Sequence, residues 1–61
     1  MKKVEALKDV TGRPGSNELS FRQGEILLVT WHRDKNWWRA NRPNGDEGLI
    51  NKEDVQVLQG M

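Results

Sequence analysis

A chain of 61 residues has room for one small core, and its make-up of 34% hydrophobic and 31% charged residues is polar for a folded domain. Ten Lys and Arg against nine Asp and Glu leave a net charge of +1, and cysteine is absent. The near-zero charge excludes an overall electric field that would attract nucleic acid or anionic lipid, and the lack of cysteine excludes a disulfide framework and a thiolate metal site. From the length we expect one domain over residues 1–61, monomeric and without a cofactor.

Short strands separated by turn residues are predicted along the first half of the chain. An apolar segment at residues 4–7 precedes a loop at residues 11–17, which holds two Gly, one Pro, Ser and Asn. The run Gln-Gly-Glu at residues 23–25 predicts a turn. Residues 26–31 form the clearest strand because all six are apolar or β-favouring, and the polar residues 32–36 end it.

The second half predicts a hairpin. Residues 37–41 form a strand, and the Asn44-Gly45 pair after it is the preferred sequence of a two-residue type I′ turn, which leads into a returning strand at residues 47–51. Two elements complete the chain: a tight turn or single 3₁₀ turn at residues 52–54 and a last strand at residues 55–58. Five short strands without an amphipathic helix predict an all-β fold that closes as a small antiparallel barrel.

The order of these features resembles the Src homology 3 (SH3) family over residues 4–58. Six segments carry the resemblance: Ala6-Leu7-Lys8-Asp9-Val10, Asn17-Glu18-Leu19-Ser20-Phe21, Gln23-Gly24-Glu25-Ile26, Trp37-Trp38, Gly48-Leu49-Ile50 and Val55. The resemblance implies a five-stranded SH3-type barrel with a short 3₁₀ turn before the last strand. It also implies a non-catalytic, adaptor-type interaction module that holds proline-rich segments between aromatic rings.

The residues at the two proline-binding slots depart from the family pattern. The opening Tyr residues fall on Lys8 and Val10, the groove Pro on Asn51, the following Asn on Glu53 and the last Tyr on Asp54. Because aromatic contacts carry much of the affinity for such a peptide, we expect weak or atypical peptide recognition. Ordinary binding of PxxP peptides is the alternative.

The sequence retains two residues of the family's binding surface, a tryptophan and an acidic residue. Successive strand residues face opposite ways, so one of Trp37 and Trp38 must face away from the core, and the resemblance makes this one Trp37. Glu18 stands at the position that pairs with a ligand Arg in the family, which implies a protein or peptide partner that contains Arg or Lys. The candidate ligand-binding residues are Lys8, Asn17, Glu18, Trp37, Leu49, Asn51, Glu53 and Asp54.

Several of these side chains have a second interpretation. Glu53 and Asp54 either cap the short turn or make this face acidic. A Lys8–Asp54 ion pair would close the first proline slot and stabilise the fold by roughly 1 kcal/mol at most. Trp31 has no usual counterpart in the family, and we expect it to pack under the following loop, whereas His32 is expected to be solvated.

Other classes of function remain open at this point. A small nucleic-acid or chromatin-binding barrel would use basic residues with Trp31 or Trp37 for stacking, although neighbouring acids dilute the charge. The basic residues are Arg33, Lys35, Arg39 and Arg42. A third alternative is a structural module that packs within its own protein.

Catalysis and membrane insertion have no candidate segments. The sequence contains no catalytic Ser, His and acid grouping, no metal-ligand spacing and no phosphate-binding glycine loop, so it predicts no enzyme. No apolar run approaches the roughly 20 residues that span a bilayer, and no signal peptide is evident. We therefore expect a cytoplasmic domain of a larger protein.

Overall fold

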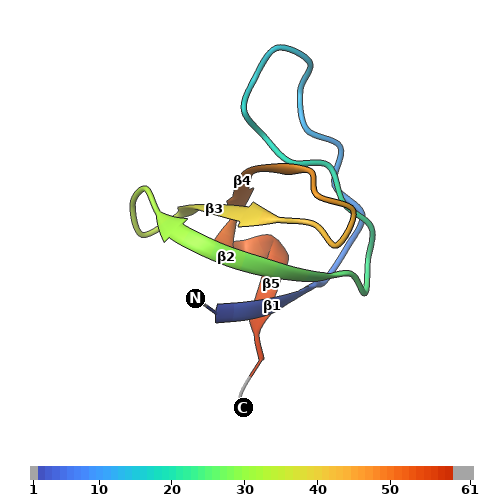
Figure 1. Ribbon diagram of the computed structural model, residues 1–61, viewed down its shortest axis with the longest axis vertical. Helices are drawn as coiled ribbons and strands as arrows, with labels where there is room; N and C mark the ends of the chain where they lie inside the picture. Colours follow the sequence, from blue (N-terminus) through green and yellow to red (C-terminus); the bar gives the residue numbers. More distant parts are fainter. Residues whose placement is uncertain (1, 59–61) are drawn as a thin grey trace.

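The computed structural model describes residues 2–58, which form a single five-stranded sheet and one short 3₁₀ helix (Figure 1). The elements are β1 (Lys2–Ala6), β2 (Ile26–His32), β3 (Trp37–Asn41), β4 (Glu47–Asn51), η1 (Lys52–Asp54) and β5 (Val55–Val57). Neighbouring strands are antiparallel, in the order β4-β3-β2-β1-β5. The predicted all-β fold is confirmed, including the 3₁₀ turn before the last strand. Residues 2–58 include no helix with the length and apolar character that spanning a membrane requires.

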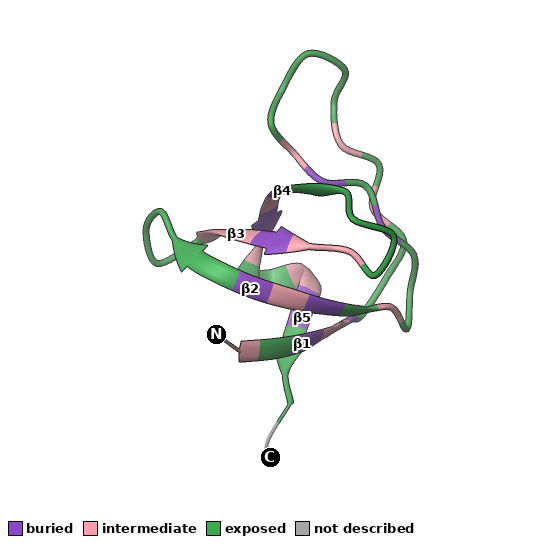
Figure 2. Cartoon of the chain, viewed as in Figure 1, coloured by how far each residue is buried: buried purple, intermediate pink, exposed green. Residues whose placement is uncertain are grey.

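The core forms from alternate residues of the strands, because successive side chains of a strand point to opposite faces. In β2 the buried residues are Leu27 and Val29, and Figure 2 shows this alternation along the strand. The remaining buried side chains are those of Val4, Ala6, Leu19, Phe21, Ala40, Ile50 and Val55. Trp38 is partly buried and packs against this core.

A long loop over residues 7–25 leaves the sheet after β1 and extends away from it before returning to β2 (Figure 1). Its base is closed by Val10 and Phe21, each of which donates its N–H to the carbonyl oxygen of the other at 2.9 Å. Leu19 and Phe21 anchor this loop because both are buried in the core.

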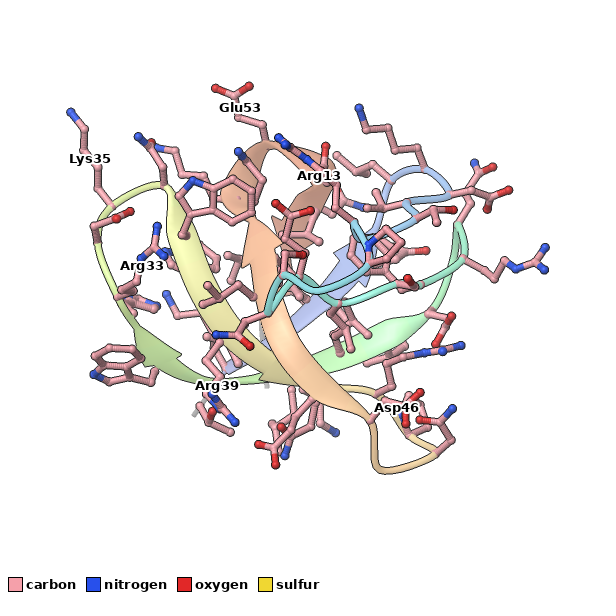
Figure 3. The ribbon with its side chains drawn as sticks, turned by 90° about the horizontal axis from the view of Figure 1, so that it is seen from above. Arg13, Arg33, Lys35, Arg39, Asp46 and Glu53 are labelled. Carbon is pink, nitrogen blue, oxygen red and sulfur yellow. The ribbon has the colours of Figure 1, made fainter. Side chains whose placement is uncertain are left out.

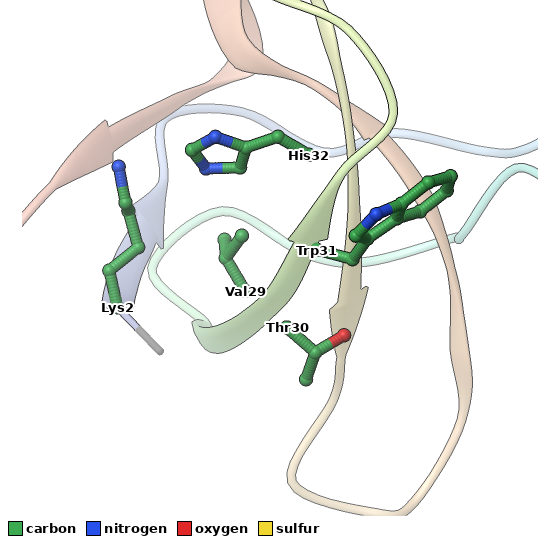
Figure 4. A pocket seen from close by; sticks show the side chains of 5 residues that line it. All are labelled: Lys2, Val29, Thr30, Trp31 and His32. Atoms are coloured by element: carbon green, nitrogen blue, oxygen red, sulfur yellow. The ribbon is translucent and has the colours of Figure 1, made fainter.

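A β-bulge changes which way the end of β2 faces. Val29 pairs with Ala40, but Trp31 pairs with Arg39, so Thr30 is an extra residue in β2. The extra residue reverses the alternation, and Trp31 and His32 lie on opposite sides of the strand (Figure 4). Trp31 is 57% exposed, so the prediction that it packs under the following loop is wrong.

The bulge also brings His32 to the side of the sheet where Trp38 lies. His32 is exposed, as predicted, but its ring stacks on Trp38 with centroids 4.6 Å apart and an angle of 20° between the planes. Lys2 adds a cation near the same indole, with Nζ 4.9 Å from the ring centroid. The His32 ring and the Lys2 ammonium group together cover part of the Trp38 indole.

The β3–β4 hairpin differs from the predicted two-residue turn. Arg42 N–H donates to the Asp46 carbonyl at 2.7 Å and Gly45 N–H to the Arg42 carbonyl at 3.0 Å, so the loop has three residues. Pro43, whose φ its ring fixes at about −65°, and Asn44 occupy the centre of the turn. Gly45 follows with φ of 100°, which favours glycine. The Asn44-Gly45 pair is therefore not the turn centre, because Pro43 suits the first central position.

Candidate functional site

The long loop is bonded to the outer edge of β4. Leu49 N–H donates to the Asn17 carbonyl at 2.7 Å, and Leu19 N–H donates to the Leu49 carbonyl at 2.9 Å. Gly48 permits this approach, because a Cβ at this position would lie 2.7 Å from the Asn17 carbonyl oxygen. The contact covers part of an open strand edge and holds the loop beside β4.

Within the long loop, hydrogen bonds hold Glu18 in place. Arg13 N–H donates to Glu18 Oε1 at 3.2 Å, and Glu18 N–H donates to Ser16 Oγ at 3.2 Å. The Ser16 hydroxyl in turn donates to the Arg13 carbonyl at 2.7 Å. The Glu18 carboxylate is thus held towards Arg13, while the Glu18 backbone pairs with Leu49 of β4.

The β2–β3 loop, residues 33–36, is organised by Asp34. Its Oδ1 accepts the N–H groups of Asn36 and Trp37, both at 2.9 Å. These bonds favour the charged form and hold the pKa of Asp34 below its ordinary value. Arg33 and Asp34 also donate their N–H groups to the Trp37 carbonyl at 3.0 and 3.3 Å. The start of β3, and with it Trp37, is fixed in this way.

Two open pockets meet at Trp37. The first, which we call the loop pocket, has a volume of about 300 Å³ and lies between the long loop and the β2–β3 loop. Its lining comprises Ser16, Asn17, Glu18, Arg33, Trp37 and Leu49. The second, the inner pocket, has a volume of about 290 Å³ and extends towards η1. Its lining comprises Val10, Arg13, Glu18, Leu19, Trp37, Leu49, Ile50, Asn51, Glu53 and Asp54.

The two pockets share Glu18, Trp37 and Leu49, so they form one continuous groove. Seven of the eight candidate ligand-binding residues line it; Lys8 is the exception. The structure therefore brings together residues from the long loop, β3, β4 and η1.

Lys8 is nevertheless linked to the groove through Asp54. Its Nζ lies 3.1 Å from Asp54 Oδ1, which is the ion pair that the sequence predicts. The Asp54 side chain is 19% exposed, whereas that of Lys8 is 65% exposed. Of this pair, Asp54 lines the η1 end of the inner pocket, and Lys8 lies beside it.

The cap of η1 comes from Asn51. Its Oδ1 accepts the N–H of Glu53 at 2.9 Å. The interpretation of Glu53 and Asp54 as caps is therefore wrong, because Asn51 already satisfies this end of the helix. Glu53 is exposed at the inner pocket (Figure 3).

Two arginines of the groove were not among the predicted ligand-binding residues. Arg13 lines the inner pocket, and Arg33 lines the loop pocket with its Cζ 5.9 Å from the centroid of the Trp37 ring. The sequence offers one indication that Arg33 lies near Trp37: it stands four residues before Trp37, at the opposite end of a short polar loop. Its place over the ring depends on how that loop closes.

The basic residues of the nucleic-acid alternative are largely engaged by acids. Arg39 Nη2 lies 2.9 Å from Glu47 Oε1, and Arg42 Nη2 lies 2.8 Å from Glu25 Oε1. The hydrogen bonds from Arg42 hold the pKa of Glu25 below its ordinary value. Such pairing reduces the positive potential that phosphate binding requires.

Metal ligands do not cluster in the described part of the chain. Between residues 2 and 58, no three or more His, Asp or Glu side chains are arranged to hold an ion. The groove presents an aromatic ring, carboxylates and guanidinium groups.

A family model described as "SH3 domain" matches residues 5–50. Protein csh3 of Schizosaccharomyces pombe is 34% identical over 59 residues, covering 97% of this chain and 19% of that protein. The high osmolarity signaling protein SHO1 of Saccharomyces cerevisiae is 44% identical over 43 residues, covering 70% of this chain and 11% of its own. The chain thus spans less than a fifth of the length of these curated relatives.

Solved structures agree with this match. The C-terminal SH3 domain of myosin IB from Entamoeba histolytica, bound to an EhFP10(GEF) peptide, superposes with a TM-score of 0.87 at 32% identity and covers 98% of this chain and 86% of its own. The SH3 domain of yeast NBP2 has a TM-score of 0.84 at 27% identity, with 97% of this chain and 100% of that chain covered.

Proposed function

Because this chain belongs to the SH3 domain family, a family of generally non-catalytic interaction modules, we propose that it binds an extended protein segment along the groove that crosses Trp37. The observation that carries the proposal is that the loop pocket and the inner pocket share Glu18, Trp37 and Leu49. A ring between two adjoining pockets offers a flat anchor to an extended chain. The similar myosin IB domain, whose structure contains a bound peptide, supports a peptide as the partner.

The proposed segment is not an ordinary proline-rich one. The resemblance places groove residues of the family at Lys8, Asn51, Glu53 and Asp54. Asp54, paired with Lys8, lines the η1 end of the inner pocket. Charged groups at this place keep their water more readily than rings do, so they offer a proline little apolar surface. Weak binding of PxxP peptides follows.

A basic residue in the partner would complement the inner pocket. Glu18 and Glu53 contribute carboxylates there, whereas Arg13 contributes one guanidinium. An Arg of the ligand would pair with these carboxylates near the face of Trp37. We propose on this basis a protein segment that contains Arg or Lys, bound by a domain of a larger intracellular signalling protein.

Amide shifts of the labelled chain test this function. Two probes are titrated: a proline-rich decapeptide and the same peptide with an Arg-Lys pair at one end. We expect the Trp37 indole and the Glu18 and Leu49 amides to move, with the basic peptide binding about threefold or more tightly. Absence of any shift at these three residues with both peptides would contradict the groove assignment. A mixed single-stranded oligonucleotide at low salt, which should leave Trp31 and Trp37 unchanged, tests the nucleic-acid alternative.

A further inference from the structure

Arg33 places a positive charge at the opposite end of the groove from the acidic inner pocket. We propose that Arg33 is a specificity-determining residue that selects a carboxylate side chain in the bound segment. The inference rests on the proposed function, since it concerns the ligand of the same groove. It adds a feature that the acidic residues alone do not predict: the segment carries an Asp or Glu at the loop pocket and a basic residue at the inner pocket.

The position of Arg33 is determined by its loop. Asp34 closes the β2–β3 loop by accepting two backbone N–H groups, and the Arg33 N–H is bonded to the Trp37 carbonyl at 3.0 Å. The loop therefore presents the guanidinium close to Trp37, with Cζ 5.9 Å from the ring centroid. Figure 3 shows Arg33 at the base of the loop that carries Lys35 at its tip.

Part of the guanidinium is available to a ligand. Within residues 2–58 its only hydrogen bond to a side chain runs from Nε to Asp34 Oδ2 at 3.4 Å, which is long for a charged pair. The Arg33 side chain is 47% exposed. The two terminal nitrogens can therefore donate in parallel to both oxygens of a carboxylate, the geometry in which arginine binds carboxylates most specifically.

The charge at the loop pocket disfavours a cation there. A ligand Arg that approached Trp37 from this side would meet the like charge of Arg33, which already lies near the ring. Glu18 faces the same pocket from the long loop, but its Oε1 already accepts the N–H of Arg13. A ligand carboxylate next to Arg33 and a ligand basic group next to Glu18 would each meet the opposite charge.

A random dodecapeptide library displayed on phage and selected on the whole 61-residue chain tests the inference. We expect Asp or Glu to be enriched at one fixed position of the selected motif. The best peptide and its Glu→Gln and Glu→Lys forms are then synthesised, and their dissociation constants are measured from Trp fluorescence. On the unaltered chain the Glu→Lys peptide should bind about tenfold more weakly than the parent peptide.

Reversing the charge at position 33 of the domain tests whether Arg33 causes the preference for a carboxylate. In Arg33→Glu the Glu→Lys peptide should bind more tightly than the parent peptide, and in Arg33→Gln these two peptides should bind with equal affinity. Arg39→Gln is the matched control, because Arg39 is paired with Glu47 and lines neither pocket; it should keep the preference. Arg33→Gln keeps the test decisive if Arg33→Glu fails to fold.

The possible failures are distinguishable. If the library yields no peptide that moves the Trp37 resonance, the proposed function fails and the inference fails with it. If peptides bind across Trp37 but their preference at every position is the same for the unaltered chain and for Arg33→Gln, the inference alone is overturned. A tighter binding of Arg-containing peptides to Arg33→Gln also overturns it, since Arg33 would then compete with the ligand instead of selecting it.

Discussion

Lys8 Nζ and Asp54 Oδ1 are 3.1 Å apart at the η1 end of the inner pocket, where the family resemblance places two tyrosines. Each residue comes from a different part of the chain, one from the segment after β1 and the other from the end of η1. The pair therefore joins the start of the long loop to the turn before β5. Its removal affects the shape of the pocket as well as its charge.

Replacing both members of this pair should create a proline slot. In the double variant Lys8→Tyr with Asp54→Tyr, two rings line the η1 end of the inner pocket, and a proline-rich decapeptide should bind about tenfold more tightly than to the unaltered chain. Titration followed by Trp fluorescence measures the change. Lys8→Ala breaks the ion pair without adding a ring and should give no such gain; equal gains in both variants would contradict the argument.

Trp37 should be the main anchor of any ligand that occupies the groove. Trp37→Ala removes the ring shared by the two pockets and should weaken binding of a selected peptide by about 2 kcal/mol or more, a factor of roughly 30. Trp31→Ala is the control, since Trp31 is exposed but lines neither pocket of the groove. Isothermal titration compares the two, and an equal loss of affinity would remove the special role of Trp37.

The Glu25–Arg42 pair should make stability depend on pH. Hydrogen bonds from Arg42 at 2.8 and 3.0 Å lower the pKa of folded Glu25 from its ordinary 4.5, so the unfolded state takes up a proton first as pH falls. The stabilisation is fully present above about pH 5 and disappears as pH falls through the folded pKa.

Glu25→Gln isolates this contribution. The variant should lose about 1 kcal/mol of unfolding free energy at pH 7, and the difference from the unaltered chain should shrink towards zero at about pH 2. Urea unfolding at both pH values measures it. A difference that stays constant between pH 7 and pH 2 would show that packing, not charge, is responsible.

Gly48 should be required for the contact between β4 and the long loop. Gly48→Ala places a Cβ 2.7 Å from the Asn17 carbonyl oxygen, and the strand or loop must move at a cost of about 1–3 kcal/mol. Gly15→Asn is a useful control, because Gly15 has open space around it and its φ of 81° is one that Asn tolerates. Thermal unfolding and the amide shifts of Asn17 and Leu49 report the effect, and an undisturbed β4 contact in Gly48→Ala would contradict it.

Strand positions and the groove were largely predictable because they depend on local pattern and on motif order. The apolar run at residues 26–31 marks β2, and the motifs around Glu18, Trp37 and Leu49 place those residues along one groove. The orientation of Trp31 was not predictable in this way. It depends on a bulge at Thr30, and a single extra residue reverses the side on which each later side chain lies.

Other features depend on competition between local preferences. Asn44-Gly45 favours one turn and Pro43 another, and the structure has the turn that begins with Pro43. The place of Arg33 depends on hydrogen bonds from Asp34 to backbone groups that residue types alone do not reveal. In both cases the sequence contains the residues, and the conformation of a few peptide units decides their use.

The bulge at Thr30 determines on which face of the sheet the last two side chains of β2 lie. If Thr30 were paired in an unbroken ladder, it would stand opposite Arg39, and Trp31 would stand opposite Trp38 in the place now held by His32. Two indoles would then share one side of the sheet, and the exposed indole would be lost from the other. The one-residue bulge in β2 therefore decides which aromatic side chains the domain exposes on each side of the sheet.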